Sequence, residues 1–291
     1  MVNFGLIGAA GYIAPRHIRA IKESGAKLVV ATDPHTSVGI LDQYSMDIEY
    51  FPEIEQFDKY MQTHQIDWVS ICSPNYLHDA HIRMVLRNGA NVLCEKPLVL
   101  NSRDLDDIQV LEEQTGKHVY SVLQLRLYPS LIALKQKLLS QPENIRHKVN
   151  LTYITARGPW YNKTWKGRIE QSGGIITNIG IHLFDLMLWL FGDFISSETR
   201  YSNSNRASGK ILLQNAEITW KLSTALEDLP ANKECKSAYR EIEIDGEILE
   251  FSNGFTDLHT LTYQEILVGR GFGIKQARPA IELVEQLRKI Q

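Results

Sequence analysis

The chain has 291 residues, 44% of them hydrophobic and 22% charged, which is typical of a globular protein with room for two domains. Its formal net charge is -3, and its lysines and arginines form no long block, which argues against a nucleic-acid interface. The longest apolar region, residues 179–192, includes His182 and Asp185 and is too short to span a bilayer, so we expect no membrane segment.

The first residues lead directly into a strand-like pattern, without the basic and apolar regions of a signal peptide. Three cysteines, Cys72, Cys94 and Cys235, lack CxxC spacing, so we expect reduced thiols and a cytoplasmic protein. His78 and His81 could share one helix face, but no third ligand is evident beside them, and we predict no metal site.

Through residue 122, short apolar segments alternate with helical ones. Strands are predicted at 3–7, 27–32, 67–72, 91–94 and 118–123, and helices at 15–23, 53–64, 76–87 and 102–114. Because this alternation is typical of βαβ units, we predict a Rossmann fold with a doubly wound parallel sheet over residues 1–122.

The turn after the first strand is rich in small residues, with Gly8, Ala10 and Gly11 before a helix that starts near Pro15. Small residues let backbone N–H groups approach a pyrophosphate, and the helix N-terminus adds partial positive charge. Asp33 ends the second strand 25 residues after Gly8, where a carboxylate binds ribose hydroxyls and repels a 2′-phosphate. We therefore predict NAD rather than NADP; a tight turn beside a loop aspartate is the alternative.

After residue 122 the pattern changes. A helix is predicted at 130–139, strand-like alternation at 148–156, 206–222 and 240–251, and further helices at 258–267 and 275–289. Asp245-Gly246 lies between two alternating runs and is a strong hairpin signal. We predict an α+β domain with an open, mainly antiparallel sheet over residues 123–291, with a C-terminal helix able to pack back on the first domain.

A polar stripe marks one predicted helix of this second half. Asn178, His182 and Asp185 are spaced to share one helix face, while the other faces are apolar. The stripe faces either a cleft or an internal hydrogen-bond network. Gly180 lies inside the helix, where glycine costs about 1 kcal/mol relative to alanine, and this favours close approach of a ligand or backbone.

Lys96 follows the predicted strand at 91–94, and ligands of open α/β sheets bind beyond the carboxyl ends of the strands. Pro97 restricts the backbone of Lys96, and we consider a cis bond between them as a hypothesis. A partly desolvated lysine has a lowered pKa and can exchange a proton with a hydroxyl. A plain ion pair between Lys96 and Glu95 is the alternative.

The segment 157–168 interleaves cations with aromatic residues. Cations suit a pyrophosphate and a carboxylate, and aromatic faces suit a base and a sugar ring. The alternatives are a solvated loop or, less in keeping with the acidic chain, a single-stranded nucleic-acid site.

These motifs together resemble the Gfo/Idh/MocA oxidoreductase family. The residues that carry the resemblance are Gly8 to His17, "TDP" at 32–34, "SPNYLH" at 73–78, "CEKPL" at 94–98 and "GGIITNIGIHLFD" at 173–185. Within the family, the chain is similar to the enzymes that oxidise the C3 hydroxyl of UDP-N-acetylglucosamine uronate with NAD, in diaminouronic-acid and O-antigen biosynthesis. The one-residue expansion of the glycine-rich turn fits that subgroup.

The resemblance implies Lys96 and His182 as catalytic residues, and leaves open which of them accepts the proton. It implies cofactor contacts by Gly8, Ala10, Gly11, Tyr12, Ile13, Asp33, Ser73, Asn75, His78, Glu95, Lys96 and Gln124. It implies substrate contacts by Lys96, Arg157, Tyr161, Lys163, Trp165, Lys166, Asn178 and His182. It further implies a homotetramer, cofactor recycling by a 2-oxoacid such as 2-oxoglutarate, and a partner aminotransferase.

Two other functions fit parts of the pattern. One is a related sugar or inositol dehydrogenase, although a neutral polyol does not need the cations of 157–168. The other is a non-catalytic NAD-binding sensor, which would keep Gly8, Gly11 and Asp33 but would not need Lys96 and His182.

Overall fold

The computed structural model describes residues 1–142, 145–231, 237–250 and 257–289. Its contacts divide the chain into two units, Met1–Gln124 with Thr256–Ala277, and Leu125–Phe255 with Arg278–Gln291. The main boundary lies close to the one we predicted. The difference is Thr256–Ala277, which we placed in the second domain; it belongs to the first unit, where helix α9 (Leu258–Leu267) packs against α1 (Ala14–Glu23).

The first unit is built on a parallel sheet, which confirms the predicted Rossmann fold. The strand order is β3-β2-β1-β4-β5-β6, and every pair is parallel. The strands are β1 (Asn3–Ile7), β2 (Lys27–Thr32), β3 (Glu49–Phe51), β4 (Trp68–Ile71), β5 (Asn91–Cys94) and β6 (Val119–Ser121). We did not predict β3, which has three residues and no fully buried side chain.

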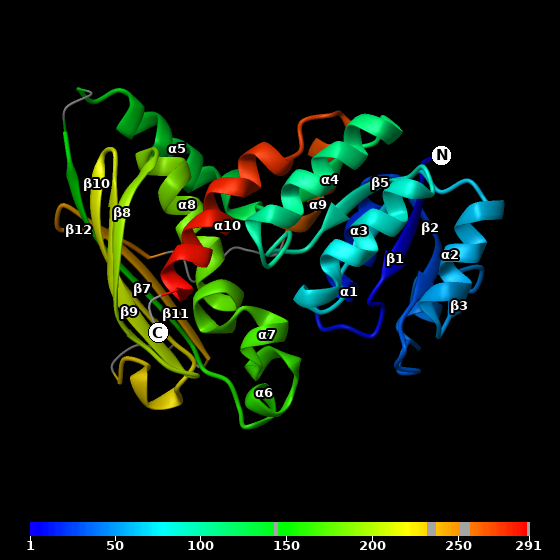
Figure 1. Ribbon diagram of the computed structural model, residues 1–291, viewed down its shortest axis with the longest axis horizontal. Coiled ribbons are helices and arrows are strands. Elements are labelled where there is room, and N and C mark those ends of the chain that lie inside the picture. Colours follow the sequence, from blue (N-terminus) through cyan, green and yellow to red (C-terminus); the bar gives the residue numbers. More distant parts are fainter. Residues whose placement is uncertain (143–144, 232–236, 251–256, 290–291) are drawn as a thin grey trace. The chain divides into compact units, whose positions relative to one another are not determined.

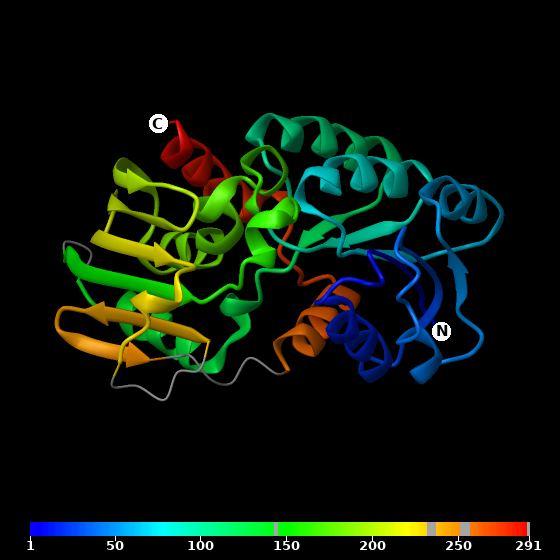
Figure 2. The ribbon, with the colours of Figure 1, turned by 90° about the horizontal axis from the view of Figure 1, so that it is seen from below.

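Helices cover both faces of this sheet. Figure 2 shows α1 and α9 on one face, with α3 and α4 on the other. Besides α1 and α9, the helices are α2 (Ile54–Thr63), α3 (His78–Arg87), α4 (Ser102–Thr115) and the start of α10 (Ile274–Arg288). Of α10, Ile274–Ala277 belongs to the first unit and the remainder to the second, while packing of this helix on the first domain stays a prediction.

The second unit contains a mixed, mainly antiparallel sheet, as predicted. Its order is β12-β11-β7-β10-β9-β8, and only β7 and β10 pair in parallel. The strands are β7 (His147–Thr155), β8 (Phe194–Ser202), β9 (Arg206–Leu213), β10 (Ala216–Ser223), β11 (Ala238–Ile244) and β12 (Glu247–Glu250).

Helices α5 (Pro129–Leu139) and α8 (Ile181–Phe191) lie on one face of this second sheet (Figure 1). The α8 side of β10 is buried, and Phe184 packs edge-to-face on Trp220 with ring centroids 5.3 Å apart. Alternate residues of β10 are exposed on the other face. Short helices α6 (Trp160–Lys163) and α7 (Ile169–Ser172) and a π-helical turn (Ile176–Gly180) precede α8.

The helical run Ile169–Phe191 corrects our argument about membrane spans. It has 23 residues, and its most apolar 18-residue window has a mean hydropathy of 1.6, so by length and composition alone it could cross a bilayer. However, 78% of its most apolar window is buried inside the protein, as expected for the core helix of a globular domain. Burial, and not shortness, is therefore the reason to regard it as a core helix.

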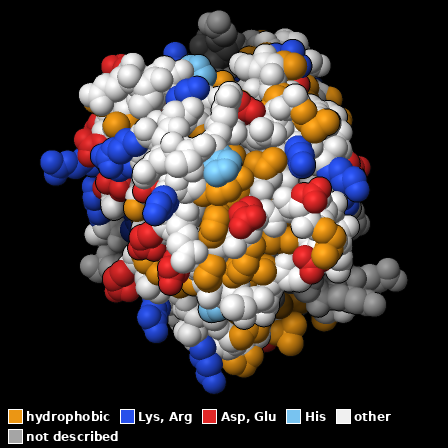
Figure 3. Space-filling view, turned by 90° about the vertical axis from the view of Figure 1, so that its right-hand side faces the viewer, with side chains coloured by type: hydrophobic (Ala, Val, Ile, Leu, Met, Phe, Trp, Pro, Cys, Tyr) orange, Lys and Arg blue, Asp and Glu red, His pale blue; other side chains and the backbone are white. Residues whose placement is uncertain are grey.

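Figure 3 shows the charged side chains on one face of the protein. On the face drawn in Figure 3, the described lysines and arginines are interspersed with aspartates and glutamates, and apolar side chains lie between them. Such a face does not offer the continuous basic surface that a phosphate backbone needs. Cys72 and Cys94 are free thiols, while Cys235 lies outside the described residues.

A buried ion pair anchors α8 within the second unit. The guanidinium of Arg126 donates from Nε and Nη2 to the two carboxylate oxygens of Asp185, at 3.0 and 2.7 Å. Burial raises the pKa of Asp185, and the Arg126 guanidinium opposes that rise. These two hydrogen bonds place Asp185 in an internal network with Arg126, one of the two surroundings that we expected for the polar stripe.

We predict that Gly8→Ala destabilises the protein more than Gly25→Ala. Both glycines have a positive φ, +91° and +76°, which costs alanine about 1–2 kcal/mol. A Cβ at Gly8 would also lie 2.7 Å from the carbonyl carbon and oxygen of Cys72, whereas nothing lies within 4 Å at Gly25. We expect about 3 kcal/mol or more for Gly8→Ala in urea unfolding. If both variants lost the same free energy of unfolding, the close approach of Gly8, after β1, to Cys72, after β4, would be contradicted.

We predict that Arg126→Met lowers the free energy of unfolding by about 3–5 kcal/mol at pH 7, because it leaves a buried carboxylate without its partner. The pKa of Asp185 then rises further above its unfolded value of about 3.9, so the folded state binds more protons, and stability falls as pH rises from about 4 to 7. Adding Asp185→Asn should restore most of the loss. A pH-independent loss in the single variant would show that the pair is not the cause.

Candidate functional site

The turn after β1, which is the predicted phosphate cradle, is closed by backbone hydrogen bonds. Gly8 donates its backbone N–H to the Thr32 carbonyl at 2.9 Å, and Gly11 closes the turn on the Gly8 carbonyl at 3.1 Å. Helix α1 starts at Ala14, with a proline in its first turn. Residues 8–11 carry no side chain larger than a methyl group, which suits the close approach of a pyrophosphate. Tyr12 is 82% exposed, and its predicted cofactor contact stays a prediction, as does that of Ile13.

Asp33 ties this turn to the end of β2. Its carboxylate accepts the backbone N–H of Ala10 at 3.0 Å and that of His35 at 2.8 Å, one on each oxygen. A carboxylate has about four acceptor sites, so two remain for ribose hydroxyls. Asp33 therefore orders the cradle and can also bind the cofactor, a double role that the sequence did not indicate.

The loops after β4 and β5 are joined through His78. Its Nδ1 lies 2.7 Å from the Pro97 carbonyl oxygen, and its Nε2 lies 2.8 Å from the Ser73 carbonyl oxygen. Burial lowers the pKa of His78, while the two carbonyls act in the opposite direction. A neutral His78 ring donates a hydrogen bond to one of these two carbonyls, whereas a protonated ring donates to both. The contact with Pro97 places this histidine beside the Lys96–Pro97 bond, which is cis, as we hypothesised.

Two further predicted cofactor residues lie at the same strand end. Ser73 contacts His81 through its Oγ, 2.9 Å from Nδ1, and burial lowers the pKa of His81 to about 4. Asn75 is buried in the 3₁₀ turn that precedes α3. His78 and His81 thus each make hydrogen bonds within the protein.

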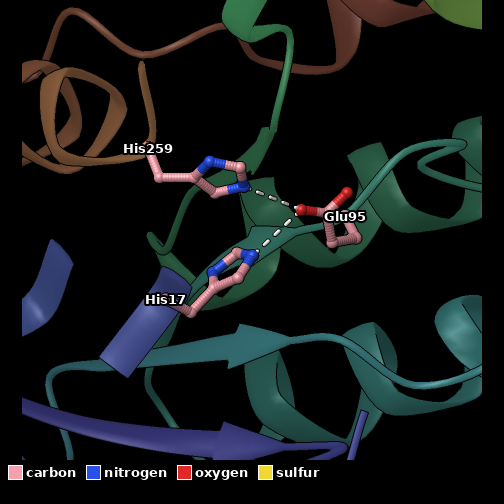
Figure 4. A group of neighbouring side chains, drawn as sticks. All are labelled: His17, Glu95 and His259. Atoms are coloured by element: carbon pink, nitrogen blue, oxygen red, sulfur yellow. Dashed lines mark hydrogen bonds and ion pairs between the residues drawn. The ribbon is translucent and has the colours of Figure 1, made fainter. Parts of the chain in front are cut away.

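Glu95 is held by two histidines that we did not predict (Figure 4). Its Oε1 lies 2.9 Å from Nε2 of His17 in α1 and 3.4 Å from Nε2 of His259 in α9. Its Oε2 accepts the backbone N–H of Lys96 at 3.3 Å. Contact of Glu95 with a cofactor stays a prediction. His17 lies on the buried face of its helix among apolar residues, where the sequence gives a histidine no distinguishing signal.

Gln124 has an amide oxygen that is buried and lacks a hydrogen-bond partner within the described part of the chain. A buried acceptor without a donor is costly, and a bound ligand is one way to satisfy it. This observation fits the predicted contact between Gln124 and the cofactor.

In the second unit, Tyr161 and Asn178 are paired. The Asn178 amide donates from Nδ2 to the Tyr161 hydroxyl at 2.7 Å, and both side chains are buried. Tyr161, predicted to contact substrate, is therefore placed to orient Asn178. Burial raises the pKa of Tyr161, so the phenol remains protonated at neutral pH.

The cations of 157–168 differ in their surroundings. Lys166 has its ammonium 5.5 Å from the ring centroids of both Trp160 and Trp165, whereas Arg157 and Lys163 are exposed. A cation between two indoles is held in place by their π faces. Arg168 is exposed as well, so the segment has one ordered cation and three solvent-exposed ones.

The polar stripe follows a π-helical turn and then α8, so the ideal α-helical spacing that we assumed is interrupted. Asn178 lies in the π turn, a feature often found at functional sites. His182 is partly exposed, while Asp185 is buried against Arg126. Our interpretation of Gly180 was wrong: an added Cβ would lie 2.6 Å from Phe184 and 2.7 Å from Leu222 on β10, so core packing explains this glycine.

Comparison with known proteins supports this description. A family model described as "Oxidoreductase family, NAD-binding Rossmann fold" matches residues 2–123, and its companion, "Oxidoreductase family, C-terminal alpha/beta domain", matches residues 145–225. Among curated proteins, 2,7-anhydro-N-acetylneuraminate hydratase of Mediterraneibacter gnavus is 26% identical over 196 residues, which cover 66% of this chain. The match covers 50% of that protein, so the chain spans about half the length of such curated relatives.

Two solved structures resemble the chain over its whole length. Both are of the WlbA (WbpB) dehydrogenase from Thermus thermophilus, one with NAD and alpha-ketoglutarate and the other with NAD and UDP-GlcNAcA. The first is 46% identical with a TM-score of 0.97, and the second is 45% identical with a TM-score of 0.96. Each comparison covers 100% of this chain and 96% of the other. Because the two family models match well over half of its residues, the chain belongs to the Gfo/Idh/MocA oxidoreductase family and has an NAD-binding Rossmann domain.

Proposed function

We propose that the protein oxidises the C3 hydroxyl of UDP-N-acetylglucosamine uronate to a 3-keto sugar, with NAD as the hydride acceptor. The observation that carries this proposal is the full-length likeness to a dehydrogenase solved with NAD and UDP-GlcNAcA. The types of residue at the predicted site also support the proposal.

NAD, when bound, supplies the acceptor for the hydride. The open turn at Gly8 and Gly11 and the N-terminus of α1 are suited to the pyrophosphate. The free acceptor sites of Asp33 are suited to the adenine ribose, and its charge disfavours a 2′-phosphate. These features support NAD rather than NADP.

Alcohol oxidation requires removal of a hydride from the carbinol carbon and of a proton from its oxygen. We propose that His182 takes the proton and that Lys96 donates a hydrogen bond to the oxygen as negative charge develops there. The reverse assignment stays open. Lys96 follows the end of β5, and His182 lies at the start of α8; neither side chain is fully buried, which supports these roles.

The segment 157–168 is proposed to bind the nucleotide and the carboxylate. Exposed Arg157 and Lys163 suit charge-assisted hydrogen bonds to a pyrophosphate or carboxylate, and Lys166 with Trp165 offers an ordered cation beside an aromatic face. Asn178, oriented by Tyr161, is proposed to bind the sugar near the reacting carbon. A neutral polyol would leave these cations without a function, which favours a nucleotide-sugar uronate over inositol.

The wider setting is also a proposal. We propose that 2-oxoglutarate reoxidises the cofactor, supported by the related complex with NAD and alpha-ketoglutarate. We further propose a cytoplasmic homotetramer in lipopolysaccharide O-antigen biosynthesis, where an aminotransferase consumes the 3-keto product. A ketone beside an acetamido group is a suitable acceptor for an amine, which supports that order of reactions.

We predict that Lys96→Ala and His182→Asn each lower kcat for UDP-GlcNAcA oxidation by about 100-fold or more, because each removes a proton-transfer or oxyanion-stabilising group. NADH formation, with and without 2-oxoglutarate, measures the effect, and myo-inositol serves as the comparison substrate. Lys59→Ala and His64→Asn, exposed positions of α2 and its C-terminal end, are matched controls that should retain activity. Near-native turnover in either test variant would remove that residue from the mechanism, and faster oxidation of inositol would overturn the proposed substrate.

A further inference from the structure

We propose that His17 and His259 are positioning residues for the reaction: they hold Glu95 as an anion whose second oxygen fixes the backbone of Lys96. This inference rests on the catalytic role proposed for Lys96. It assigns a role to a buried cluster, Ser70, Tyr263, His17, Glu95 and His259, which lies entirely in the first unit.

The cluster joins segments that are far apart in the sequence. Glu95 directly follows β5, His17 belongs to α1, and His259 belongs to α9. Figure 4 shows both imidazoles pointing to the same carboxylate oxygen. His17 and His259 are 0% and 2% exposed, so water does not compete for these hydrogen bonds.

The chemistry of the acceptor fixes the direction of every hydrogen bond. An ionised carboxylate only accepts, so His17 and His259 each carry a proton on Nε2. Nδ1 of neutral His17 then accepts from the Tyr263 hydroxyl, 2.8 Å away. That hydroxyl in turn accepts from Ser70 Oγ, 2.5 Å away. The resulting order runs from Ser70 through Tyr263 and His17 to Glu95.

This chain of hydrogen bonds ends inside the protein. Ser70 lies on β4 and is 0% exposed, so no proton can leave the site by this route. Proton transport is therefore not what the cluster provides. Because every hydrogen bond in this buried series has a fixed donor and a fixed acceptor, the series instead fixes the orientation of its last group, the Glu95 carboxylate.

The electrostatics agree with an anion that accepts a hydrogen bond from a neutral His17 ring. Burial alone would raise the pKa of Glu95, but the hydrogen bonds from His17 and His259 hold it well below its usual range. Burial lowers the pKa of His17, despite the opposing effect of Glu95. Burial also raises the pKa of the neighbouring Cys72 and Cys94 thiols well above normal, so they stay neutral.

A metal ion is the competing explanation, because the three ligand atoms of His17, Glu95 and His259 lie within 4.8 Å of one another. However, Nδ1 of His259 is buried and has no hydrogen-bond partner among the described residues. A metal on Nε2 would place the ring proton on that Nδ1, as a buried donor without an acceptor. In the hydrogen-bonded arrangement Nδ1 of His259 carries no proton. A buried unprotonated nitrogen costs less free energy than a buried N–H without an acceptor, so the structure favours the hydrogen bonds over a metal ion.

The anion acts on Lys96 through the main chain. Glu95 donates its own N–H to the Ile71 carbonyl at 2.9 Å, and its Oε2 accepts the Lys96 N–H at 3.3 Å. On the far side of Lys96, His78 contacts the Pro97 carbonyl at 2.7 Å. The backbone of Lys96 is thus held before and after the residue, which places its side chain reproducibly.

The test compares His17→Leu, His17→Gln and Glu95→Gln with His147→Leu. Leucine removes both ring contacts, whereas glutamine can still donate to Glu95 and accept from Tyr263. Glu95→Gln keeps the shape but replaces one acceptor oxygen with a donor, so either the histidines or the Lys96 N–H loses its acceptor. His147, which is also buried and pairs with a carboxylate at 2.6 Å but in the second unit, is the matched control.

Two measurements are needed: amide hydrogen exchange of the peptide that contains Lys96, followed by mass spectrometry, and kcat and KM with NAD and UDP-GlcNAcA. We expect His17→Leu and Glu95→Gln to speed exchange by about tenfold and to lower kcat by about tenfold or more with little change in KM. His17→Gln and His147→Leu should stay close to the unmodified protein. If His17→Leu does not fold, Glu95→Gln and His17→Gln decide the question.

Unchanged exchange or unchanged kcat in Glu95→Gln would overturn the inference. A stoichiometric metal, detected by elemental analysis of the purified protein and lost in His17→Leu, would overturn it in favour of a metal site. If the unmodified protein does not oxidise UDP-GlcNAcA, the proposed function fails, while hydrogen exchange still shows whether the cluster fixes Lys96.

Discussion

The candidate site residues of the first unit depend on one constraint, the parallel pairing of β1 with β4 and of β4 with β5. Because the three strands run in the same direction, their carboxyl ends meet at one edge of the sheet. The loops that follow carry the turn at Gly8, the Ser73–His78 segment and the Glu95–Lys96 pair. The Lys96 N–H donates to the Glu95 carboxylate, and His78 contacts the Pro97 carbonyl, so the fold holds the backbone around Lys96 before any ligand binds.

The order and type of the main elements could be predicted because each carries a strong local signal. The predicted strands 3–7, 27–32 and 91–94 match the structure. Short apolar runs between turn residues are typical of buried parallel strands, so the pattern identified them. Strand β3 has only three residues and lies at a sheet edge, so its sequence is too short to show the alternation of apolar and polar residues that indicates a strand. The π turn at Ile176–Gly180 was missed because it depends on packing, as Gly180 against Leu222 shows, and not on helix propensity.

The candidate site was predictable only in part. Lys96, Asp33 and the turn at Gly8 stand out because they follow strands, where parallel sheets place ligands. His17 and His259 did not, because each pairs with a residue far away in the sequence and a buried histidine on an apolar face resembles any core position. Likewise, the partner of Asp185 is Arg126, which no helical spacing could indicate. Long-range pairs of this kind follow from tertiary packing alone.

The most direct test of the account is a crystal structure of the protein with NAD and UDP-N-acetylglucosamine uronate. We expect the C3 hydroxyl oxygen within hydrogen-bond distance, about 2.6–3.2 Å, of both the Lys96 ammonium and the His182 ring, with the C3 hydrogen directed at the nicotinamide. A sugar bound with another carbon at the nicotinamide, or with either side chain out of reach of that hydroxyl, would contradict it.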